Sequence, residues 1–459
     1  MRKSSKKIDF SGKKVAVLGF GIEGQETVEF LLKHEASVHV FDEKEESTFD
    51  ASRLKFLRNE GVAFTFGTFS SLENFDLIIR SPGVKPGIRV LHNAADKGIP
   101  LTSATNVFFE NAKGVTIGIT GTKGKGTTAA LLYQMLKTAG REVYLGGNIG
   151  VPALSFLKKL SDTSISILEL SSFQLMDLQL SPHIAIVLMV TQDHLDYHTS
   201  RDEYVFAKSG IAKFQSPSDY VISNVDYPAS LKIAEFSPGR KLFFSNRNKV
   251  PEGCFIENDS VIVKTRKKKE KIMSTAEVLL PGRHNLENIC AAVMAAQLLN
   301  VPNSIIRDVL KTFPGLEHRL ELVREVGGVK YYNDSISTTP ESAIAAIQAF
   351  SAPEILIVGG SSKGSDFSEL GNVISRAKNI KAVIGIGAEW PKIKERIKSK
   401  ELRIKIVEGL KTMNEIVETA HKLAKPGDVV ILSPACASFD MFADYKDRGN
   451  QFKKYVNML

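Results

Sequence analysis

The sequence predicts an α/β protein with three domains, each built on a mostly parallel sheet covered by helices. Short apolar runs alternate with helical segments along all 459 residues, and this alternation is typical of parallel sheets. Two glycine-rich segments, residues 19–24 and 121–128, each join an apolar run to a helix. Turns of this kind lie at the carboxyl ends of strands, where ligands bind. We expect the domains to cover residues 1–103, 104–314 and 315–459.

Composition is that of an ordinary globular protein, with 43% hydrophobic and 24% charged residues. The three cysteines, Cys254, Cys290 and Cys436, are too few for a disulfide framework and lack the spacing of a metal site. The sequence shows no signal peptide and no apolar run of about 18 residues. Together with reduced thiols, these features predict a cytoplasmic protein without membrane insertion.

The formal net charge is +9, but the basic residues are scattered, so we expect no nucleic-acid partner. The one dense basic run, residues 264–271 (KTRKKKEK), is interpreted as a solvated loop or hairpin. A mild positive balance suits anionic nucleotide substrates.

The first domain is expected to be Rossmann-like. A strand at residues 15–18 runs into residues 19–24 (GFGIEG), and a helix continues to about residue 34. A second strand ends at Asp42, about 20 residues after the first glycine, which matches the dinucleotide-binding fingerprint. A later strand, residues 76–79, is followed by Ser81, Pro82 and Gly83. This geometry accepts NAD or another nucleotide diphosphate, and an ordinary tight turn is the remaining alternative.

The second domain is expected to be a P-loop-type ATPase domain with a mostly parallel sheet. A strand at residues 115–120 and a helix at about 127–139 flank a glycine-rich loop. The loop and its first helical residues are Gly121, Thr122, Lys123, Gly124, Lys125, Gly126, Thr127 and Thr128. Backbone N–H groups in such a loop hold phosphate oxygens, a lysine reaches the terminal phosphates, and a hydroxyl helps to bind Mg²⁺. The spacing departs from the standard Walker form because position 119 is Ile.

Polar side chains follow two further strands of this domain. Glu169 ends the apolar run 165–169, and residues 191–198 (TQDHLDYH) follow the next strand. The carboxyl ends of parallel strands face the ligand crevice, and Mg²⁺ prefers oxygen donors beside phosphate. Glu169 is therefore a candidate Mg²⁺ ligand, with a solvated strand-end carboxylate as the alternative.

The third domain is also expected to be Rossmann-like. Its predicted strands are residues 355–358, 382–386 and 429–432, with helices between them. One helix begins at Pro340, because proline suits the first helical position and Glu341 the first turn.

With these motifs assembled, the chain resembles the Mur ligase family, and within it the ligases that add D-glutamate. The resemblance covers nearly the whole chain in order. Its motifs are residues 121–128, 146–150 (GGNIG), 168–175 (LELSSFQL), 191–196, 280–285 (LPGRHN) with Asn288, 317–319 (EHR), 333–335 (NDS) with 337–342, 359–367 and 433–440 (SPACASFD).

The resemblance implies an ATP- and Mg²⁺-dependent enzyme. It assigns ATP contacts to the phosphate loop with Lys125, and to Asn288, Arg319 and Asp334. It assigns catalytic or metal-binding roles to Lys125, Glu169, His194, Lys208 in carbamylated form, and Thr127. It assigns the uridine diphosphate end of the substrate to Phe20, Gly21, Ile22, Asp42 and Ser81, the sugar-peptide to Asn148, and the incoming amino acid to Thr338, Lys363, Ser438 and Phe439.

The implied reaction activates the carboxylate of UDP-N-acetylmuramoyl-L-alanine as an acyl phosphate, which the amine of D-glutamate then attacks. This step belongs to peptidoglycan precursor synthesis, and a monomer is expected. Two positions depart from the family pattern. Gly126 follows the loop lysine where Ser or Thr is usual, which displaces the hydroxyl to Thr127, and Ile336 stands where some D-glutamate ligases carry lysine.

Four alternatives stay open. Another Mur ligase would add a different amino acid, but residues 333–342 and 433–440 favour D-glutamate. A folylpolyglutamate synthase is suggested by the Gly126 spacing, and the first domain and residues 433–440 argue against it. An NAD-dependent dehydrogenase would use residues 19–24 but leaves the loop 121–128 unexplained. A non-catalytic nucleotide-binding regulator is raised by Gly126 alone.

Overall fold

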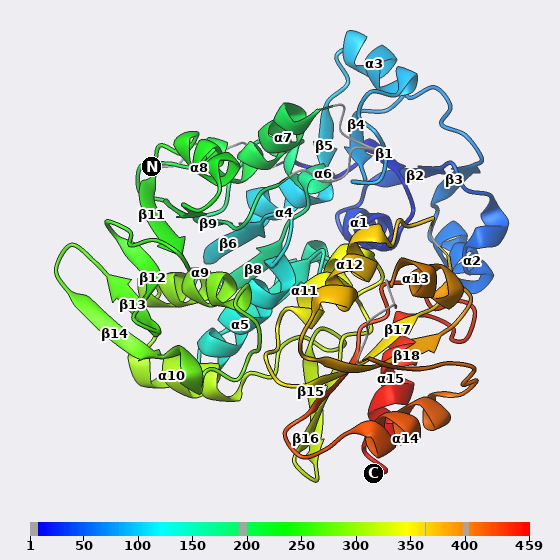
Figure 1. The fold of residues 1–459 in the computed structure, drawn as a ribbon. Helices are drawn as coiled ribbons and strands as arrows, with labels where there is room; N and C mark the ends of the chain where they lie inside the picture. Colours follow the sequence, from blue (N-terminus) through cyan, green and yellow to red (C-terminus); the bar gives the residue numbers. More distant parts are fainter. Residues whose placement is uncertain (1–7, 192–199, 363, 398–403) are drawn as a thin grey trace. The chain divides into compact units, whose positions relative to one another are not determined.

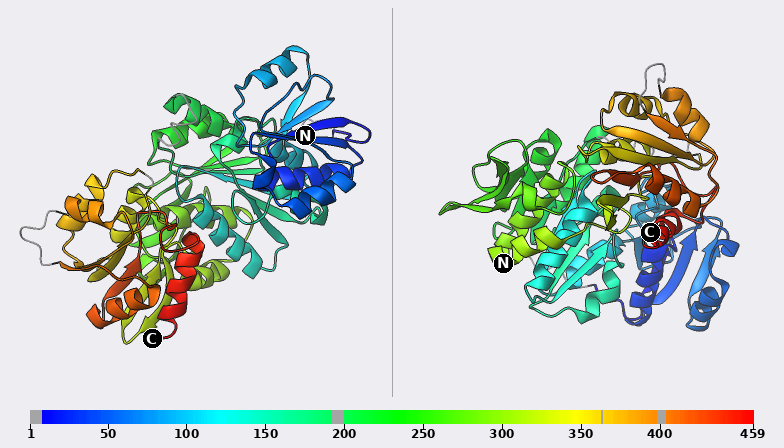
Figure 2. Two further views of the ribbon diagram at one scale, coloured as in Figure 1. Left: turned by 90° about the vertical axis from the view of Figure 1, so that its right-hand side faces the viewer. Right: turned by 60° about the horizontal axis from the view of Figure 1, so that its bottom comes forward.

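The computed structural model describes residues 8–191, 200–362, 364–397 and 404–459. It contains three sheets, each flanked by helices (Figures 1 and 2). The chain forms two compact units. One is Met1–Thr275 with Glu287–Val309, and the other is Ala276–Leu286 with Leu310–Leu459. The α/β fold class with mostly parallel sheets is confirmed. Among the described residues, no helix is long and apolar enough to cross a membrane.

The first sheet is fully parallel, with strand order β3-β2-β1-β4-β5. Its elements are β1 (Lys14–Leu18), α1 (Ile22–Leu32), β2 (Ser37–Asp42), η1 (Glu46–Thr48), α2 (Ala51–Asn59), β3 (Ala63–Phe66), β4 (Leu77–Arg80), α3 (Arg89–Asp96), β5 (Leu101–Ser103) and α4 (Ala104–Asn111). Alternate residues of β1 face opposite sides: Val15 and Val17 pack in one core with Val28 of α1, and Ala16 packs in another with Leu91 of α3. The strand order reverses beside β1, so its carboxyl end opens a crevice.

The second sheet has nine strands in the order β14-β13-β12-β11-β10-β9-β6-β8-β7. Its elements are β6 (Val115–Thr120), α5 (Lys125–Thr138), β7 (Val143–Gly147), η2 (Ala153–Lys159), β8 (Ile165–Glu169), α6 (Ser172–Leu175), β9 (Ile184–Val187), α7 (Arg201–Lys213), β10 (Tyr220–Asn224), α8 (Pro228–Glu235), β11 (Arg240–Ser245), β12 (Gly253–Glu257), β13 (Ser260–Lys264), β14 (Lys269–Ser274), η3 (Thr275–Glu277), α9 (Asn285–Leu298) and α10 (Asn303–Thr312). Helix α5 covers one face and α7 and α8 the other (Figure 1). The basic run 264–271 spans the turn of the antiparallel β13–β14 hairpin, which confirms its interpretation.

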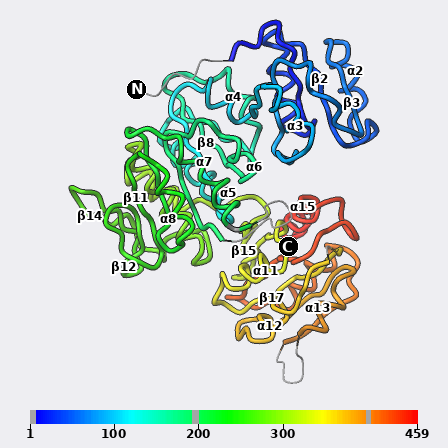
Figure 3. The backbone as a smooth tube through the Cα atoms, turned by 90° about the horizontal axis from the view of Figure 1, so that it is seen from above, coloured from blue at the N-terminus to red at the C-terminus, as the bar shows by residue number. Residues whose placement is uncertain are grey.

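The third sheet has the order β15-β16-β20-β17-β18-β19, with an antiparallel edge at β15. In Figure 3 this part of the chain is coloured from yellow-green to red. Its elements are β15 (Glu321–Val326), β16 (Val329–Asn333), α11 (Pro340–Ile347), β17 (Glu354–Gly359), α12 (Ser368–Arg376), β18 (Ile380–Ile386), α13 (Trp390–Arg396), β19 (Lys405–Val407), α14 (Met413–Leu423), β20 (Val429–Leu432) and α15 (Tyr445–Val456). Helices α11, α12 and α13 share one core with the sheet, and α14 and α15 share a separate one. Separate cores are expected for the two faces of a doubly wound sheet.

Candidate active site

The glycine-rich loop of the second sheet leads directly into α5. Strand β6 ends at Thr120 and the helix begins at Lys125, two residues earlier than the sequence suggests. The N-cap, Gly124, has a φ of +89°, which glycine adopts without strain. A side chain at Gly124 would also collide with the carboxamide of Asn288. The first N–H groups of a helix have no acceptor within the helix itself, and such groups suit phosphate oxygens.

Two lysine ammonium groups meet at this loop. The Nζ of Lys125 donates to the carbonyl oxygens of Gly121, at 3.0 Å, and Thr122, at 3.2 Å. The Nζ of Lys208 donates to the same Gly121 oxygen and to the Oγ1 of Thr120, both at 3.3 Å. Lys208 is only 1% exposed and its ammonium lies over the ring of Tyr204. Sharing one acceptor concentrates positive charge where a polyphosphate would bind.

Side chains of α5 and α9 complete the loop. The Oγ1 of Thr128 donates to the Oδ1 of Asn288 at 3.3 Å, so the amide predicted to contact ATP lies against the phosphate loop. The neighbouring Thr127 is buried on the first turn of α5. Along the chain, Thr127 is the first residue with a hydroxyl after Lys125 and Gly126.

The carboxylate of Glu169 lies at the end of β8, the strand next to β6. Glu169 is paired in register with Ile119 and is buried. Its backbone oxygen accepts from the N–H of Asn148 at 2.9 Å, and its Oε1 accepts from the Nδ2 of Asn148 at 3.2 Å. The two residues are therefore held together at the sheet edge that carries the phosphate loop. A carboxylate such as that of Glu169 is the kind of oxygen donor that Mg²⁺ prefers beside phosphate oxygens.

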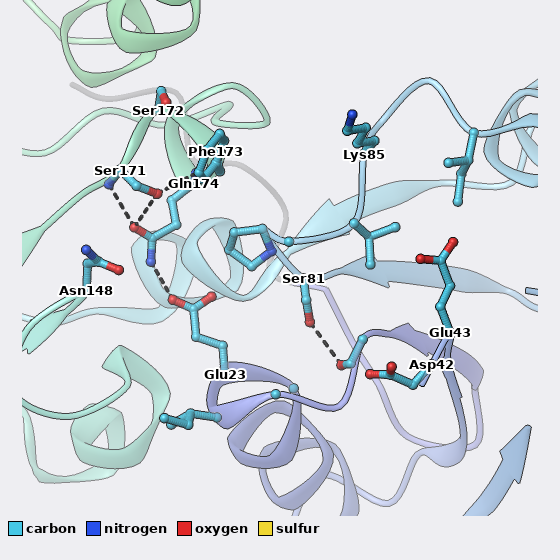
Figure 4. Close-up of a pocket in the computed structure, with 18 of the residues that line it drawn as sticks. Glu23, Asp42, Glu43, Ser81, Lys85, Asn148, Ser171, Ser172, Phe173 and Gln174 are labelled. Carbon is cyan, nitrogen blue, oxygen red and sulfur yellow. Dashed lines mark hydrogen bonds between the residues drawn. The ribbon is translucent and has the colours of Figure 1, made fainter. Parts of the chain in front are cut away.

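A cavity of about 720 Å³ is lined both by residues that follow strands of the first sheet and by Lys125 of the phosphate loop. Figure 4 shows part of its wall. Among the residues assigned from the sequence, its wall includes Gly21, Ile22, Asp42, Ser81, Lys125, Asn148 and Lys208. The ring of Phe20 packs instead in the core of the first sheet, against Phe49 and Phe64. Phe20 can therefore offer only its backbone to a ligand.

The polar residues of the first sheet brace the glycine-rich turn. The Oδ2 of Asp42 accepts from the N–H of Phe20 at 2.6 Å, and its Oδ1 accepts from the N–H of Lys44 at 2.9 Å. The hydroxyl of Ser81 donates to the carbonyl of Gly19 at 3.0 Å. In the dinucleotide fingerprint the acidic residue bonds a ribose hydroxyl, whereas here it already orders two turns of the backbone.

Sequence reasoning missed part of this cavity. Its wall also contains Glu23, Lys44, Phe69, Lys85, Ser171, Ser172, Phe173, Gln174 and Tyr204. Four of these lie in residues 171–174, inside the motif 168–175, in which sequence reasoning assigns a role to Glu169 alone. Lys44 and Lys85 follow the ends of β2 and β4, and their place at strand ends was an available signal.

A buried ion pair holds the wall of the cavity in place. Arg80, which is fully buried at the end of β4, pairs with Asp177 beyond α6. Its guanidinium also donates to the carbonyl of Val84. Burial raises the pKa of Asp177, and Arg80 partly offsets this effect. One side chain thereby ties the turn after β4 to the segment that carries Phe173 and Gln174.

In the second unit, the carboxyl ends of β16 and β20 carry two neighbouring loops. The N–H of Ala435 donates to the carbonyl of Ser337 at 2.9 Å, and the Oγ of Ser433 donates to the Oδ2 of Asp334 at 2.8 Å. The Oδ1 of Asp334 accepts from the N–H of Leu320, beside Arg319. Burial raises the pKa of Asp334 to about 6.

The residues assigned to the amino-acid substrate lie along these loops. Thr338 is half-buried after β16, and Ser438 is buried. The ring of Phe439 is 72% exposed, and its N–H donates to the Oγ of Ser361 at 3.0 Å. His194 and Lys363 lie outside the described residues.

A fully buried arginine, absent from the sequence-based site, connects the same loops. Arg448 of α15 donates to the Oγ and carbonyl oxygen of Ser335 at 2.9 Å each. It also donates to the carbonyls of Cys436 and Ala437 at 3.2 Å. Burial lowers the pKa of Arg448 to about 10. The side chain therefore links the loop after β16 to the loop after β20 through hydrogen bonds.

Comparisons with known proteins identify the family to which the chain belongs. Three family models match along the chain: the Mur ligase MurD-like N-terminal domain at residues 13–103, the Mur ligase middle domain at 119–296 and the Mur ligase glutamate ligase domain at 318–436. The chain is 38% identical over 454 residues to the UDP-N-acetylmuramoylalanine–D-glutamate ligase of Acetivibrio thermocellus, covering 97% of both chains. The chain belongs to the Mur ligase family. The ligase of the same name from Clostridium tetani is also 38% identical, over 97% of both chains.

Solved structures of Mur ligases share the fold. The MurF ligase from Thermotoga maritima, in complex with ADP, aligns with a TM-score of 0.58 at 20% identity, covering 98% of this chain and 96% of that one. MurF from Acinetobacter baumannii aligns with a TM-score of 0.60 at 17% identity, covering 98% and 92%. Each comparison spans all three sheets of the present chain.

Proposed function

We propose that this chain is an ATP-dependent, ADP-forming amide ligase that joins D-glutamate to UDP-N-acetylmuramoyl-L-alanine in peptidoglycan precursor synthesis. The observation that carries the proposal is the single cavity that runs from the glycine-rich turn of the first sheet to Lys125 and Lys208 of the phosphate loop. A substrate with a nucleotide diphosphate at one end and a carboxylate at the other would span this cavity. Full-length relatives with this activity support the choice of substrates.

In the proposed mechanism, the carboxylate of the precursor attacks the γ-phosphate of ATP and ADP leaves. The amine of D-glutamate then attacks the resulting acyl phosphate, inorganic phosphate departs, and the amine loses a proton. Negative charge on the phosphoryl oxygens grows during the first step. The ammonium of Lys125 and the N–H groups of α5 are placed to stabilise that charge.

Mg²⁺ would be held by Glu169 and Thr127, and His194 and a carbamylated Lys208 belong to the same proposed set. When bound, the ion would neutralise charge on the phosphate oxygens. Carbamylation would convert Lys208 from a cation into an oxygen ligand, and its position against Thr120 and Gly121 is compatible with that role.

The second unit is proposed to bind D-glutamate and part of ATP. Thr338, Ser438 and Phe439, with Lys363, are assigned to the amino acid, and Arg319 and Asp334 to ATP. The loops that carry the first three lie at the carboxyl ends of parallel strands, where ligands of such sheets bind. The domain limits 1–103, 104–314 and 315–459, the cytoplasmic location and the monomeric state are further parts of the proposal.

The proposal is tested by phosphate release from ATP and Mg²⁺ in the presence of UDP-N-acetylmuramoyl-L-alanine and a panel of amino acids. D-Glutamate is expected to support turnover, while L-glutamate, L-alanine and a diamino acid are not. Turnover with one of the other amino acids alone would contradict the assignment of D-glutamate. Turnover without any UDP-linked acceptor would contradict the role of the cavity.

A further inference from the structure

An acidic side chain lies inside the cavity that is proposed to take a diphosphate. Glu23 belongs to the first turn of α1, directly after the N-cap Gly21 and Ile22. Figure 4 shows its carboxylate extending toward Gln174, between Asn148 on one side and Ser81 on the other. None of the roles assigned above uses Glu23, and a carboxylate at this place would repel phosphate oxygens.

A short chain of hydrogen bonds determines how the carboxylate is oriented. The backbone N–H of Ser171 donates to the Oε1 of Gln174 at 2.9 Å. Because that N–H can only donate, the Nε2 of Gln174 must lie on the opposite side, and it donates to the Oε1 of Glu23. One carboxylate oxygen of Glu23 is therefore engaged and held in place.

The second oxygen is left for a ligand. The Oε2 of Glu23 is buried and has no hydrogen-bond partner among the residues that the structure describes. Burial raises the pKa of Glu23, while the bond from Gln174 lowers it in part. A buried acceptor normally has a donor, and Glu23 is one of the residues that line the cavity. The missing donor is therefore expected on the substrate.

The position of Glu23 along the cavity indicates which part of the substrate supplies the donor. Asp42 and Lys44 lie at the end assigned to uridine diphosphate, and Lys125 lies at the end assigned to the reacting carboxylate. Glu23 contacts Gln174, whose segment belongs to the second sheet, and Asn148 lies on the same side in Figure 4. The sugar of the precursor would occupy this stretch. Its hydroxyl and amide N–H groups are donors, whereas phosphate oxygens are acceptors only.

We propose that Glu23 is a specificity-determining residue whose Oε2 accepts a hydrogen bond from a hydroxyl or amide N–H of the sugar of the UDP-linked substrate. This inference rests on the proposed function. Gln174 acts as a positioning residue, because it orients the carboxylate through Ser171. The glycine-rich turn would thereby hold the diphosphate while the side chain of its acidic residue recognises the sugar.

The test compares two ligands on the full-length protein by calorimetry. The variant Glu23→Gln keeps the size of the side chain, but its single amide oxygen cannot accept hydrogen bonds from both Gln174 and the substrate. The amide NH₂ group of the variant would then face either the Nε2 of Gln174 or the donor on the substrate. Affinity for UDP-N-acetylmuramoyl-L-alanine is expected to fall about ten-fold or more, as for loss of a hydrogen bond to a charged group. Affinity for UDP alone should stay near that of the wild type.

The matched control is Glu26→Gln, on the same helix but outside the wall of the 720 Å³ cavity, and it should leave both affinities unchanged. Tighter binding of UDP by Glu23→Gln would overturn the inference, because Glu23 would then merely oppose the diphosphate. Unchanged binding of both ligands would overturn it as well. Circular dichroism checks folding, and Glu23→Ser removes the same acceptor if the glutamine variant does not fold.

Failure of the proposed function would look different. In that case the wild-type protein itself would not bind UDP-N-acetylmuramoyl-L-alanine more tightly than UDP. A wild type that discriminates the two ligands, combined with a Glu23→Gln variant that discriminates them equally well, would reject only the role of Glu23.

Discussion

At the scale of single residues, Lys125 carries the strongest prediction. Lys125→Ala removes the ammonium that bonds the carbonyl oxygens of Gly121 and Thr122 in the loop before α5, so charge on the transferred phosphoryl group would lose a stabilising partner. Phosphate release should fall by about a hundred-fold or more, with an unchanged circular dichroism spectrum. Lys137→Ala is the control, because this lysine lies in the last turn of the same helix, over the ring of Tyr133. Near-normal turnover of Lys125→Ala would contradict the assigned role of the loop.

A second residue, Glu354, makes a prediction about stability rather than activity. It is fully buried at the start of β17, and its Oε2 accepts from the Nδ2 of Asn379 at 3.1 Å. Burial raises its pKa from 4.5 to about 8. Because the folded pKa lies above the unfolded one, the stability that Glu354 contributes is present in full below pH 4.5 and is lost as the pH rises toward 8.

Glu354→Gln cannot ionise and should abolish this pH dependence. Its free energy of unfolding at pH 7 is expected to exceed that of the wild type by roughly 3 kcal/mol, with a much smaller difference near pH 5. Urea unfolding at both pH values measures the effect. The exposed Glu395→Gln should leave the wild-type pH profile in place. This account would be contradicted if the free energy of unfolding of the wild type rose between pH 5 and pH 8 and that of Glu354→Gln showed the same profile.

The two buried arginines that sequence reasoning missed share one property, which is that their partners lie on other segments of the chain. Arg80 pairs with Asp177, and Arg448 brackets Ser335 and Cys436. A lone arginine in a sequence does not reveal whether it is exposed or buried, because its burial depends on carbonyl groups that only the fold assembles. Lys125 and Glu169 were predictable because each follows a recognisable strand.

At the scale of elements, the degree of burial of the strand residues explains which strands were predicted. The predicted limits of β6 and β20 agree with the structure, because both are short runs rich in β-branched residues that are buried on two faces. The sequence reading missed β3 and β7, whose residues are largely only half-buried, so their pattern does not stand out. Helix α5 begins at Lys125, two residues before the predicted start, because the left-handed Gly124 ends the loop there.

Helix α15 contacts the loops after β16 and β20 through Arg448. Arg448→Lys keeps the charge but cannot reach the acceptors on both loops, and it leaves buried carbonyls unpaired at about 1–3 kcal/mol each. We expect a lower melting temperature and a higher KM for D-glutamate, while the KM for the UDP-linked substrate changes little because that cavity lies in the other unit. Arg376→Lys, at an exposed site in the last turn of α12, is the control.

Steady-state kinetics with each substrate varied in turn would separate the effects. An equal rise in the KM of both substrates would indicate general loss of structure instead of displaced loops. Wild-type values for both would show that the loops keep their arrangement without the guanidinium.

At the scale of the whole molecule, the three predicted modules are present, but the chain groups into two compact units. One hydrophobic core continues from Val15 and Val40 of the first sheet to Leu168 and Val187 of the second, so these two sheets form one unit. The third sheet has its own cores and takes with it residues 276–286. Periodicity predicts where a strand lies, but it does not show which modules share a core, because that depends on side chains from distant segments.

This division predicts how the substrates act on the protein when each is added alone. UDP-N-acetylmuramoyl-L-alanine should protect backbone amides around residues 21–23, 81–85 and 171–174, which line one cavity. At a concentration of 100 times Kd, binding stabilises the bound state by about 2.7 kcal/mol, so exchange of amides that require opening of the site should slow by about a hundred-fold. D-Glutamate should protect residues 433–439 instead, because its proposed contacts lie on that loop.

Hydrogen exchange followed by mass spectrometry resolves these segments. The β13–β14 hairpin, whose basic tip is far in sequence from every assigned residue of the cavity, serves as the internal reference and should exchange equally in all samples. If D-glutamate alone protected residues 171–174, or if the precursor alone left residues 81–85 unprotected, the assignment of the two substrates to separate units would fail. The assignment of the two substrates to separate units follows from the sheets themselves. Each sheet presents its own row of strand ends to a ligand, and among the residues that the structure describes, one hydrophobic core is shared by the first two sheets.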